Sequence, residues 1–412
     1  MSLAAGPSGG EAVGAVAESA VMPTYTRYPV TLVRGRGTTV WDAEGNAYLD
    51  FAGGIAAIPI GHSHPSWVNA VAEQAATLTH VSNLFSTEPQ EELARRLVSL
   101  AGFGRVFFAN SGAEANEAAL KIARKHGIAA GRGSERLEVV ALQGSFHGRT
   151  FATLAATGQP AKHAQFAPLP EGFVHVPAGD RAALEAAVGD RTAAVLLEPV
   201  LGEGGVIPLE PSYLALARRL CTERGALLVL DEVQTGVGRT GEWFAFRHAG
   251  VEPDVVTLAK GLGGGLPIGA CIAGEELAFG PGEHASTFGG GPVPCRAALA
   301  VLDVIEREGL LENCRARGEE LAAGLRALDA PGVTGVRGAG LLLGVAFDGD
   351  VAGPVVRALM ARGCLATEAG PKVVRISPPL SVSAEEVDRF VTAFGDAAAS
   401  AVAINTKEET ET

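Results

Sequence analysis

The sequence contains few cysteines, and their spacing rules out two common uses. Five cysteines are spread over 412 residues, and no two form a C-x-x-C pair. This pattern excludes a disulfide framework and does not favour a zinc site, so we expect reduced and mostly buried thiols. His62 and His64 lie two residues apart without an accompanying cysteine or acidic cluster, so we expect structural roles for them and predict no metal site.

Long apolar runs and a signal sequence are also missing. No apolar stretch reaches the length that spans a bilayer. The first twenty residues are rich in alanine, glycine and glutamate, and they lack a basic start followed by an apolar core. We therefore expect no secretory signal, no membrane partner and a cytoplasmic location.

Basic residues are outnumbered by acidic ones, and the formal net charge is −13 at pH 7. A field of this sign argues against nucleic acid and anionic membranes as partners. It also repels carboxylate substrates, so any such substrate would need local arginines to capture it. The length and the 47% hydrophobic content suffice for a large core in roughly two or three domains.

Short apolar runs alternate with helical patterns through the middle of the chain. Helices are predicted over 113–126 and 211–224, and the second opens with a proline and closes at Gly225. Continuous apolar strands alternating with helices indicate an α/β fold with a mostly parallel central sheet covered on both faces. Ligands bind such sheets beyond the carboxyl ends of the strands. The predicted strands are 106–109, 137–142, 193–197, 227–230 and 255–258.

The pattern changes near Pro294, after which helices dominate. We predict a large domain over 66–293 and a smaller α+β domain built from both chain ends, 21–65 and 294–404. The remaining ends, 1–20 and 405–412, are expected to be mobile tails. The elements predicted for the smaller domain are strands within 31–50, helices 297–307, 311–328 and 355–361, an apolar segment 340–347 and a strand 372–376.

A candidate phosphate site follows the first of the buried strands and opens a helix. Its sequence is Asn110-Ser111-Gly112-Ala113-Glu114-Ala115. Free amides at a helix start bind phosphate with the help of the helix dipole, and small residues let the backbone approach closely. An ordinary helix cap is the alternative, and this motif alone favours that alternative.

Asp231 and Lys260 each lie at the end of an apolar strand. A carboxylate at Asp231 is costly unless it is paired, and either a protonated pyridine nitrogen or nearby loop amides would satisfy it. Lys260 is one of only six lysines in the chain. A partly apolar site lowers the pKa of a lysine, and the neutral amine forms Schiff bases; a solvent-facing lysine is the alternative.

Together these features supply a phosphate cradle, a partner for a ring nitrogen and an amine, all at strand ends of one sheet. They are the groups by which a protein holds pyridoxal phosphate. A nicotinamide enzyme would instead need a G-x-G-x-x-G turn after a first strand, and no glycine-rich segment here has that setting.

Further motifs keep a fixed order from about residue 25 to 395. With them, the chain resembles the fold-type-I, class-III aminotransferases, a family that includes the acetylornithine, ornithine and 4-aminobutyrate enzymes, and it is most similar to the first of these. The motifs are Asp50-Phe51-Ala52-Gly53-Gly54-Ile55, Gly61-His62-Ser63-His64-Pro65, Ser82-Asn83-Leu84-Phe85, Asn110 to Asn116, Phe146-His147-Gly148-Arg149, Glu198-Pro199, Gly202-Glu203-Gly204-Gly205, Asp231-Glu232-Val233-Gln234, Ala259-Lys260, Ser286-Thr287-Phe288-Gly289-Gly290 and Arg375.

The resemblance implies a role for the groups around the cofactor ring. Lys260 would carry pyridoxal 5′-phosphate as a Schiff base and then shuttle a proton, and Asp231 would bind the ring nitrogen. Gln234 would bond the ring oxygen, while Phe146 and Val233 would sandwich the ring.

The resemblance also implies how the phosphate is held. Gly112 and Ala113 would bind it through their backbone amides, and Ser111 belongs to the same predicted cofactor site. Thr287 would complete the phosphate site from the neighbouring subunit. The implied assembly is therefore a homodimer with shared active sites.

Two arginines in the matching motifs answer the charge problem, because a guanidinium fork suits carboxylates. The resemblance implies that Arg149 grips the α-carboxylate of the amino donor and the distal carboxylate of 2-oxoglutarate. Arg375 would bind the α-carboxylate of 2-oxoglutarate, and Glu203 would neutralise it when the ω-amino donor is bound. Tyr25 would help to hold the donor carboxylate. Structural ion pairs are the alternative for both arginines.

Three positions depart from the family pattern. Ala113 stands where a threonine is frequent, which removes a side-chain contact to phosphate. Gly291 replaces a frequent asparagine beside the segment that bears Thr287. Ile55 stands where ornithine aminotransferases have tyrosine, and this weakens the case for free ornithine.

The predicted activity is a ping-pong transamination in arginine biosynthesis. N-acetylornithine would give its δ-amino group and leave as N-acetylglutamate 5-semialdehyde, and 2-oxoglutarate would leave as glutamate. The alternatives are the same chemistry on succinylornithine, a carrier-linked lysine precursor, ornithine or 4-aminobutyrate, and an aminomutase. A non-catalytic protein of this fold would be expected to lack Lys260 or Asp231, and both are present.

Overall fold

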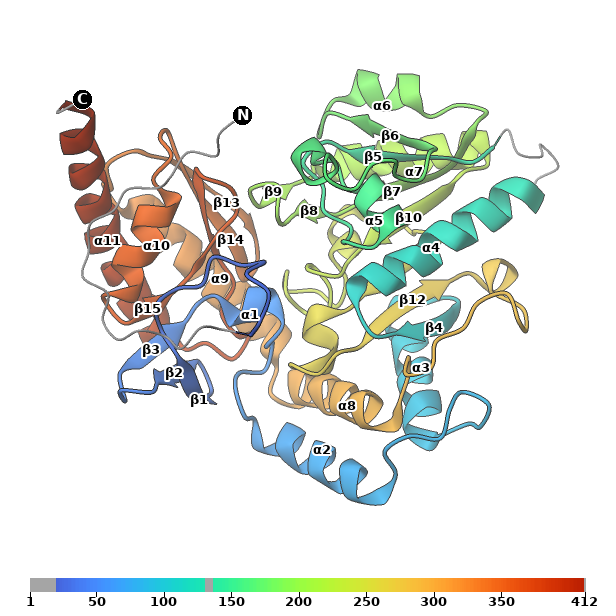
Figure 1. The fold of residues 1–412 in the computed structure, drawn as a ribbon, viewed down its shortest axis with the longest axis horizontal. Coiled ribbons are helices and arrows are strands. Elements are labelled where there is room, and N and C mark those ends of the chain that lie inside the picture. The colour runs from blue at the N-terminus through green and yellow to red at the C-terminus, as the bar shows by residue number, and fades with distance from the viewer. Residues whose placement is uncertain (1–19, 130–135, 411–412) are drawn as a thin grey trace.

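The computed structural model describes residues 20–129 and 136–410, with side chains through Val402. The predicted tail 1–20 lies almost entirely outside the described residues. At the other end, helix α11 (Ala384–Thr410) continues through residues 405–410, where a mobile tail was expected. Figure 1 shows two lobes: the middle of the chain forms the larger one, and both chain ends form the smaller one.

The larger lobe is built on a seven-stranded sheet. Every strand is parallel to the others except β12, which runs antiparallel to both of its neighbours. The mostly parallel sheet predicted from the sequence is confirmed. Its strand order is β4 (Arg105–Ala109), β12 (Gly269–Ala273), β11 (Val255–Leu258), β10 (Leu227–Asp231), β7 (Thr192–Leu197), β5 (Glu138–Leu142) and β6 (Phe173–Val176).

Helices cover both faces of this sheet, and its strands β7, β10, β11 and β12 are buried at every position. Along β10, Leu228 and Leu230 share a core with α7 (Pro211–Arg224), whereas Leu227 and Val229 share a second core with α4 (Gly112–Gly127). Successive strand side chains point to opposite faces, so the two cores lie on opposite sides of the sheet. The other elements of this lobe are α2 (Pro65–Thr77), α3 (Glu88–Ala101), α5 (Phe151–Ala156), α6 (Arg181–Ala187), the hairpin β8 (Val200–Leu201) and β9 (Ile207–Pro208), and 3₁₀ turns η3 (Pro160–Lys162), η4 (Ala245–Ala249), η5 (Lys260–Gly263) and η6 (Glu275–Leu277).

The smaller lobe brings the two chain ends together. Strand β15 (Cys364–Leu365) pairs in parallel with β3 (Ala47–Asp50), which extends the sheet of β1 (Leu32–Arg36) and β2 (Thr39–Asp42). A second, antiparallel sheet contains β13 (Val333–Ala339), β14 (Leu342–Phe347), β17 (Val373–Ile376) and β16 (Thr367–Glu368). Its helices are α9 (Leu310–Ala327), α10 (Ala352–Met360) and α11, and the short α1 (Gly53–Ala56) faces the larger lobe.

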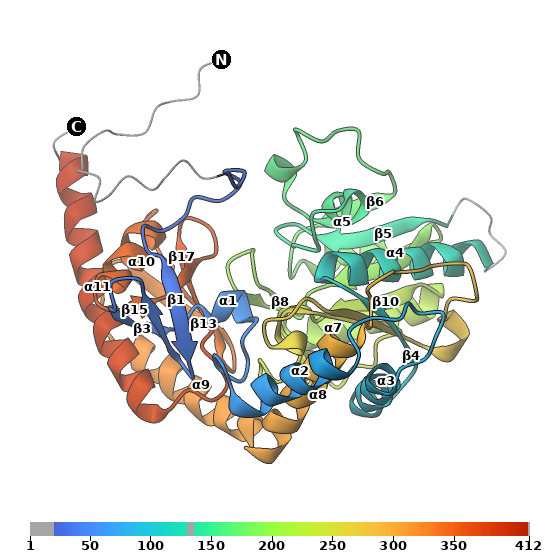
Figure 2. The ribbon, with the colours of Figure 1, turned by 60° about the horizontal axis from the view of Figure 1, so that its bottom comes forward.

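Helix α8 (Pro292–Arg307) crosses from one lobe toward the other and lies against α2 in both views (Figures 1 and 2). The exact domain boundaries proposed from the sequence stay predictions, although α2 and α8 show that the two lobes share helices near both boundaries.

The histidines and cysteines have the structural surroundings expected of them. His62 Nε2 lies 2.7 Å from Asp50 Oδ2, and His64 accepts the Ser66 amide at the start of α2. All five cysteines are free and buried. Within residues 20–129 and 136–410, no group of three or more candidate ligands could hold a metal ion, and no helix is long and apolar enough to cross a membrane.

Candidate active site

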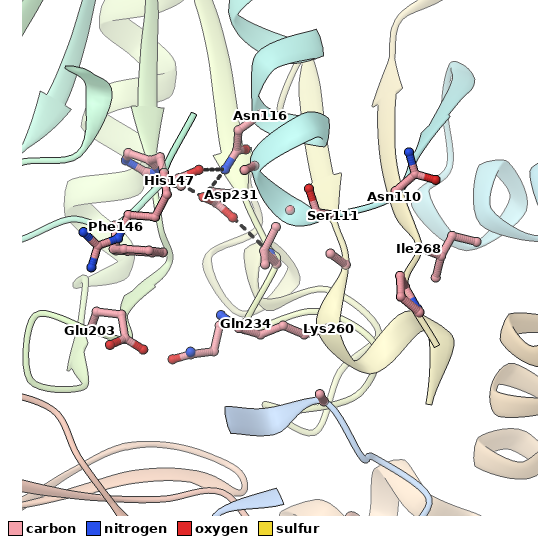
Figure 3. A pocket seen from close by; sticks show the side chains of 18 of the residues that line it. Asn110, Ser111, Asn116, Phe146, His147, Glu203, Asp231, Gln234, Lys260 and Ile268 are labelled. Carbon is pink, nitrogen blue, oxygen red and sulfur yellow. Dashed lines mark hydrogen bonds and ion pairs between the residues drawn. The ribbon is translucent and has the colours of Figure 1, made fainter. Parts of the chain in front are cut away.

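A cavity of about 420 Å³ opens at the carboxyl ends of β4, β10 and β11, where the strand-end rule places a ligand. It is lined by most of the residues predicted from the sequence, and Figure 3 shows Phe146, Asp231 and Lys260 among the side chains around it. The predicted site residues that line it are Ser111, Gly112, Ala113, Phe146, Arg149, Glu203, Asp231, Val233, Gln234 and Lys260.

The candidate phosphate cradle forms one wall of the cavity. Ser111 is the N-cap of α4, and its hydroxyl accepts the Glu114 amide at 3.2 Å. The amides of Gly112 and Ala113 occupy the first turn, where a helix offers them no internal partner. No other described residue accepts a hydrogen bond from either amide. Two free N–H groups and the positive end of a sixteen-residue helix thus face the cavity.

Gly112 is required for the shape of this wall. A Cβ atom at Gly112 would lie 2.7 Å from Cγ1 of Val233 and 2.9 Å from its Cγ2. Because real Cβ atoms do not approach other carbons so closely, any side chain here would displace Val233. The glycine therefore lets α4 start directly beside a residue that lines the centre of the cavity.

Asp231 ends β10 and is 4% exposed. Its Oδ2 accepts hydrogen bonds from Asn116 Nδ2 at 2.7 Å and from His147 Nδ1 at 2.8 Å, and its Oδ1 accepts the Val233 amide at 3.0 Å. Figure 3 shows Asn116 and His147 converging on the carboxylate. A carboxylate oxygen can accept more than one donor, so Oδ1 retains capacity for a donor in the cavity.

Three further residues are functional candidates that could not be assigned a role from the sequence, although they lie in the matched motifs: Asn116, His147 and Glu198. Asn116 is fixed by Thr257, whose hydroxyl donates to Asn116 Oδ1 at 2.7 Å. Burial raises the pKa of Glu198 to about 7, and the nearby Asp231 charge adds to the effect. Its oxygens accept the amides of Phe146 and Gly202, so Glu198 holds two segments of the cavity wall together.

Lys260 follows β11 and has a backbone φ of +38°, a strained value for a residue other than glycine. Its side chain lines the cavity, and no described residue forms a hydrogen bond with its Nζ. Burial lowers the Lys260 pKa; the negative Glu203 opposes this, and the positive Arg375 assists it. The expected partly apolar lysine site is present.

Gln234 and Phe146 lie beside Lys260 and Asp231 in the cavity (Figure 3). The buried Oε1 of Gln234 has no hydrogen-bond partner among the described residues. A Cβ atom at Gly202 would lie 1.7 Å from this oxygen, so the absence of a side chain at Gly202 lets Gln234 lie along the cavity wall. Gln234 is therefore placed to meet a polar ligand atom.

Arg375 lies on β17 of the smaller lobe, is 2% exposed and reaches the site through Glu203, with which it forms an ion pair. Burial alone would raise the Glu203 pKa, but the charges of Arg375, Lys260 and Lys162 outweigh it and lower this pKa. Arg337 of β13 donates from Nε to the Gly205 carbonyl at 2.9 Å. Two arginines of the smaller lobe thus hold the hairpin that carries Glu203.

Arg149 is exposed at the cavity mouth, with its guanidinium carbon 5.5 Å from the centre of the Phe146 ring. Tyr25 and Thr287 do not line the cavity of their own chain. Tyr25 is 80% exposed, and Thr287 is exposed in the loop before α8. Their assigned roles stay predictions.

Comparisons with known proteins agree with this geometry. The class-III aminotransferase family matches residues 20–398. The acetylornithine aminotransferase of Gloeobacter violaceus is 53% identical over 90% of this chain and 94% of its own length. The acetylornithine aminotransferase of Streptomyces coelicolor is 51% identical over 92% of this chain and 93% of its own length. The chain belongs to the class-III aminotransferases.

Solved structures of this family have the same fold. The ornithine aminotransferase of Toxoplasma gondii, which holds partially occupied PLP at its active site, superposes with a TM-score of 0.89 at 33% identity, covering 95% of this chain and 94% of its own. The N-acetylornithine aminotransferase of Stenotrophomonas maltophilia superposes with a TM-score of 0.81 at 37% identity. This match covers 92% of this chain and 98% of that protein's own chain.

Pyridoxal 5′-phosphate is the cofactor of class-III aminotransferases, and the residues of this cavity fit it. The free amides of Gly112 and Ala113 suit its phosphate, the Gln234 side chain lines the same cavity, and Lys260 supplies an amine that has no hydrogen-bond partner among the described residues. The predicted enzyme class and cofactor are confirmed.

Proposed function

We propose that this aminotransferase moves the δ-amino group of N-acetylornithine to 2-oxoglutarate, a step of arginine biosynthesis. The products are N-acetylglutamate 5-semialdehyde and glutamate. The observation that carries the proposal is a difference in ion pairing between two arginines. Arg149 lines the same cavity as Lys260, and the charge of Arg375 acts on Lys260. Arg149 has no carboxylate partner among the described residues, whereas Arg375 is neutralised by Glu203.

This asymmetry suits a donor with one carboxylate and an acceptor with two. Arg149 binds the carboxylate distant from the reacting carbon in both substrates, while Tyr25 assists with the donor. The Glu203–Arg375 pair stays closed over the ω-amino end of the donor. For 2-oxoglutarate, Glu203 moves aside and Arg375 takes the second carboxylate through its guanidinium fork.

When bound, pyridoxal phosphate supplies an aldehyde that accepts the amino group and a ring that withdraws electrons. Ser111, Gly112 and Ala113 bind its phosphate, and Phe146 and Val233 cover the two faces of the ring. Asp231 would accept a hydrogen bond from the protonated ring nitrogen, and Gln234 would bond the ring oxygen. Lys260 Nζ would remove the proton from the donor carbon and return it, and burial, which lowers the Lys260 pKa, favours the neutral amine that this role needs.

We further propose a homodimer in which Thr287 completes the partner's phosphate site. Supporting this, Leu84 is 87% exposed and Phe288 is 64% exposed. Asn83 ties their two segments together by donating to the carbonyls of Ser286 and Gly289. An apolar surface of this kind is typical of an interface. The free cysteines support a reducing compartment, and we propose the cytoplasm.

Free ornithine is the second candidate donor, because the T. gondii ornithine aminotransferase superposes over 95% of this chain with a TM-score of 0.89. Ile55 is the residue that argues against it. It has a φ of +61°, unusual for a β-branched side chain, and it is 39% exposed on the segment facing the larger lobe.

A half-reaction panel tests the proposed donor. The holoenzyme is mixed separately with N-acetylornithine, ornithine, succinylornithine and 4-aminobutyrate, and the visible absorption band is followed. We expect N-acetylornithine to give the highest kcat/KM. Equal or faster reaction with 4-aminobutyrate or ornithine would contradict the proposal.

A further inference from the structure

Lys162 places a second positive charge beside Arg149, outside the residues given a role so far. It ends the 3₁₀ turn η3, and its Nζ lies 5.8 Å from the centre of the Phe146 ring. The guanidinium carbon of Arg149 lies 5.5 Å from the same centre. Both cations therefore gather around one ring of the cavity wall.

Neither cation has an acidic partner. No carboxylate of the described residues lies within ion-pair distance of Lys162 or Arg149, and the nearby Glu203 is paired with Arg375. The two charges repel each other, and burial together with Arg149 lowers the Lys162 pKa. Two unpaired like charges held together cost free energy, which a bound anion would offset.

Local hydrogen bonds hold Lys162 in this place. Gln159 donates its amide hydrogens to the carbonyls of Gly144 at 3.3 Å and Ser145 at 3.0 Å, which directs its Oε1 at the ammonium group. An ammonium group has three donors, and Gln159 accepts only one of them. The remaining N–H donors have no partner among the described residues, and they lie beside Phe146 and Arg149, which line the cavity.

We propose that Lys162 and Arg149 together bind the substrate carboxylate farthest from the reacting carbon, so that Lys162 is a second specificity-determining residue. This rests on the proposed function only in requiring that a substrate carry such a carboxylate. The same carboxylate position occurs in the ω-amino donor and in 2-oxoglutarate. Lys162 therefore serves both half-reactions and discriminates against amines without a distal carboxylate.

The test has two measurements. Calorimetry gives the affinity of the holoenzyme for glutarate, an unreactive dicarboxylate, and steady-state kinetics give kcat and KM for 2-oxoglutarate. We expect Lys162→Gln to weaken glutarate binding about tenfold and to raise KM for 2-oxoglutarate about tenfold, as for the loss of one charged hydrogen bond. The kcat should stay within about twofold of the wild-type value. Lys162→Arg should stay within about threefold of wild type. Lys372→Gln, whose lysine contacts only the exposed Asp348 carbonyl, is the matched control.

A double variant shows whether both cations hold one carboxylate. In that case Lys162→Gln combined with Arg149→Gln loses less affinity for glutarate than the product of the single losses. Independent losses, unchanged glutarate affinity in Lys162→Gln, a fall in kcat without a change in KM, or a wild type that binds no glutarate would each overturn the proposal. Glutarate has no amino group, so its binding does not depend on which amino donor the enzyme uses. If the proposed donor is wrong, the wild-type enzyme will fail to react with N-acetylornithine while its glutarate binding stays informative.

Discussion

His147 Nδ1 lies 2.8 Å from Asp231 Oδ2, and the two side chains are almost completely enclosed. The other ring nitrogen, Nε2, is buried without a partner among the described residues. Because a carboxylate oxygen only accepts, His147 Nδ1 is the donor of this hydrogen bond. His147 thus orients the Asp231 carboxylate, together with Asn116 Nδ2 and the Val233 amide.

Replacing Asp231 should be far more harmful than replacing His147. Asp231→Asn removes the buried charge, and breaking such a pair costs roughly 3–5 kcal/mol, so kcat/KM should fall by more than about a hundredfold. His147→Asn leaves the Asn116 and Val233 donors to Asp231 in place, so its kcat/KM should fall only about tenfold. Steady-state kinetics with saturating cofactor measure both, and equal losses would contradict this ranking.

Much of the larger lobe could be predicted because its signals are local. Each of the five predicted strands has a counterpart that differs by a residue at most at either end, and the predicted helix 211–224 coincides with α7. Strands β6 and β12 were missed, because β6 is short and contains His175, and β12 is a small-residue run after a glycine-rich turn. The antiparallel direction of β12 depends on its neighbours and leaves no mark on its own residues.

The site was predicted wherever a residue type and a strand end coincide. Asp231, Lys260 and the start of α4 meet in the cavity because parallel strands end at one edge. The partners that direct them are harder to predict, since Asp231 is 115 positions from Asn116 and 84 from His147. The role that we propose for Lys162 has no sequence signal, because a lone lysine in a short 3₁₀ turn forms no pattern; it rests on the place of Lys162 beside Phe146.

The close contact of Gly112 with Val233 makes a second prediction. Gly112→Ala would push its methyl group into Val233, and such overpacking costs roughly 1–3 kcal/mol, so the cofactor should bind about tenfold more weakly. The double variant Gly112→Ala, Val233→Ala should recover part of the loss, because it removes the methyl groups in the way. Titration of the apoenzyme with pyridoxal phosphate measures this, with Val233→Ala as the control. Wild-type affinity in Gly112→Ala would refute the steric argument.

The pKa of Lys260 predicts a pH profile. The neutral amine captures the cofactor, so the capture rate of the apoenzyme should rise with pH through the Lys260 pKa and level off below the usual lysine pKa of 10.5. Glu203 raises this pKa, so Glu203→Gln should move the midpoint to lower pH. Glu171→Gln, at an exposed position, is the matched control. Stopped-flow absorbance gives the midpoints, and an upward shift in Glu203→Gln would contradict the prediction.

Arg337 should influence substrate choice without touching the cavity. Its Nε holds the Gly205 carbonyl, and Gly205 belongs to the same hairpin loop as Glu203. Arg337→Gln loses this hydrogen bond and frees the loop, so Glu203 leaves Arg375 more readily. An exposed Arg375 favours substrates with a carboxylate at the reacting carbon, such as glutamate, over ω-amino donors.

We therefore expect Arg337→Gln to shift the ratio of kcat/KM for N-acetylornithine to that for glutamate by about fivefold toward glutamate, the worth of a typical hydrogen bond. Arg326→Gln, at an exposed site on α9, should leave the ratio unchanged. Single-turnover rates with each donor give the ratio directly. Equal loss with both donors would mean that Arg337 supports the fold alone, because only a change in the Glu203–Arg375 pair separates the two half-reactions.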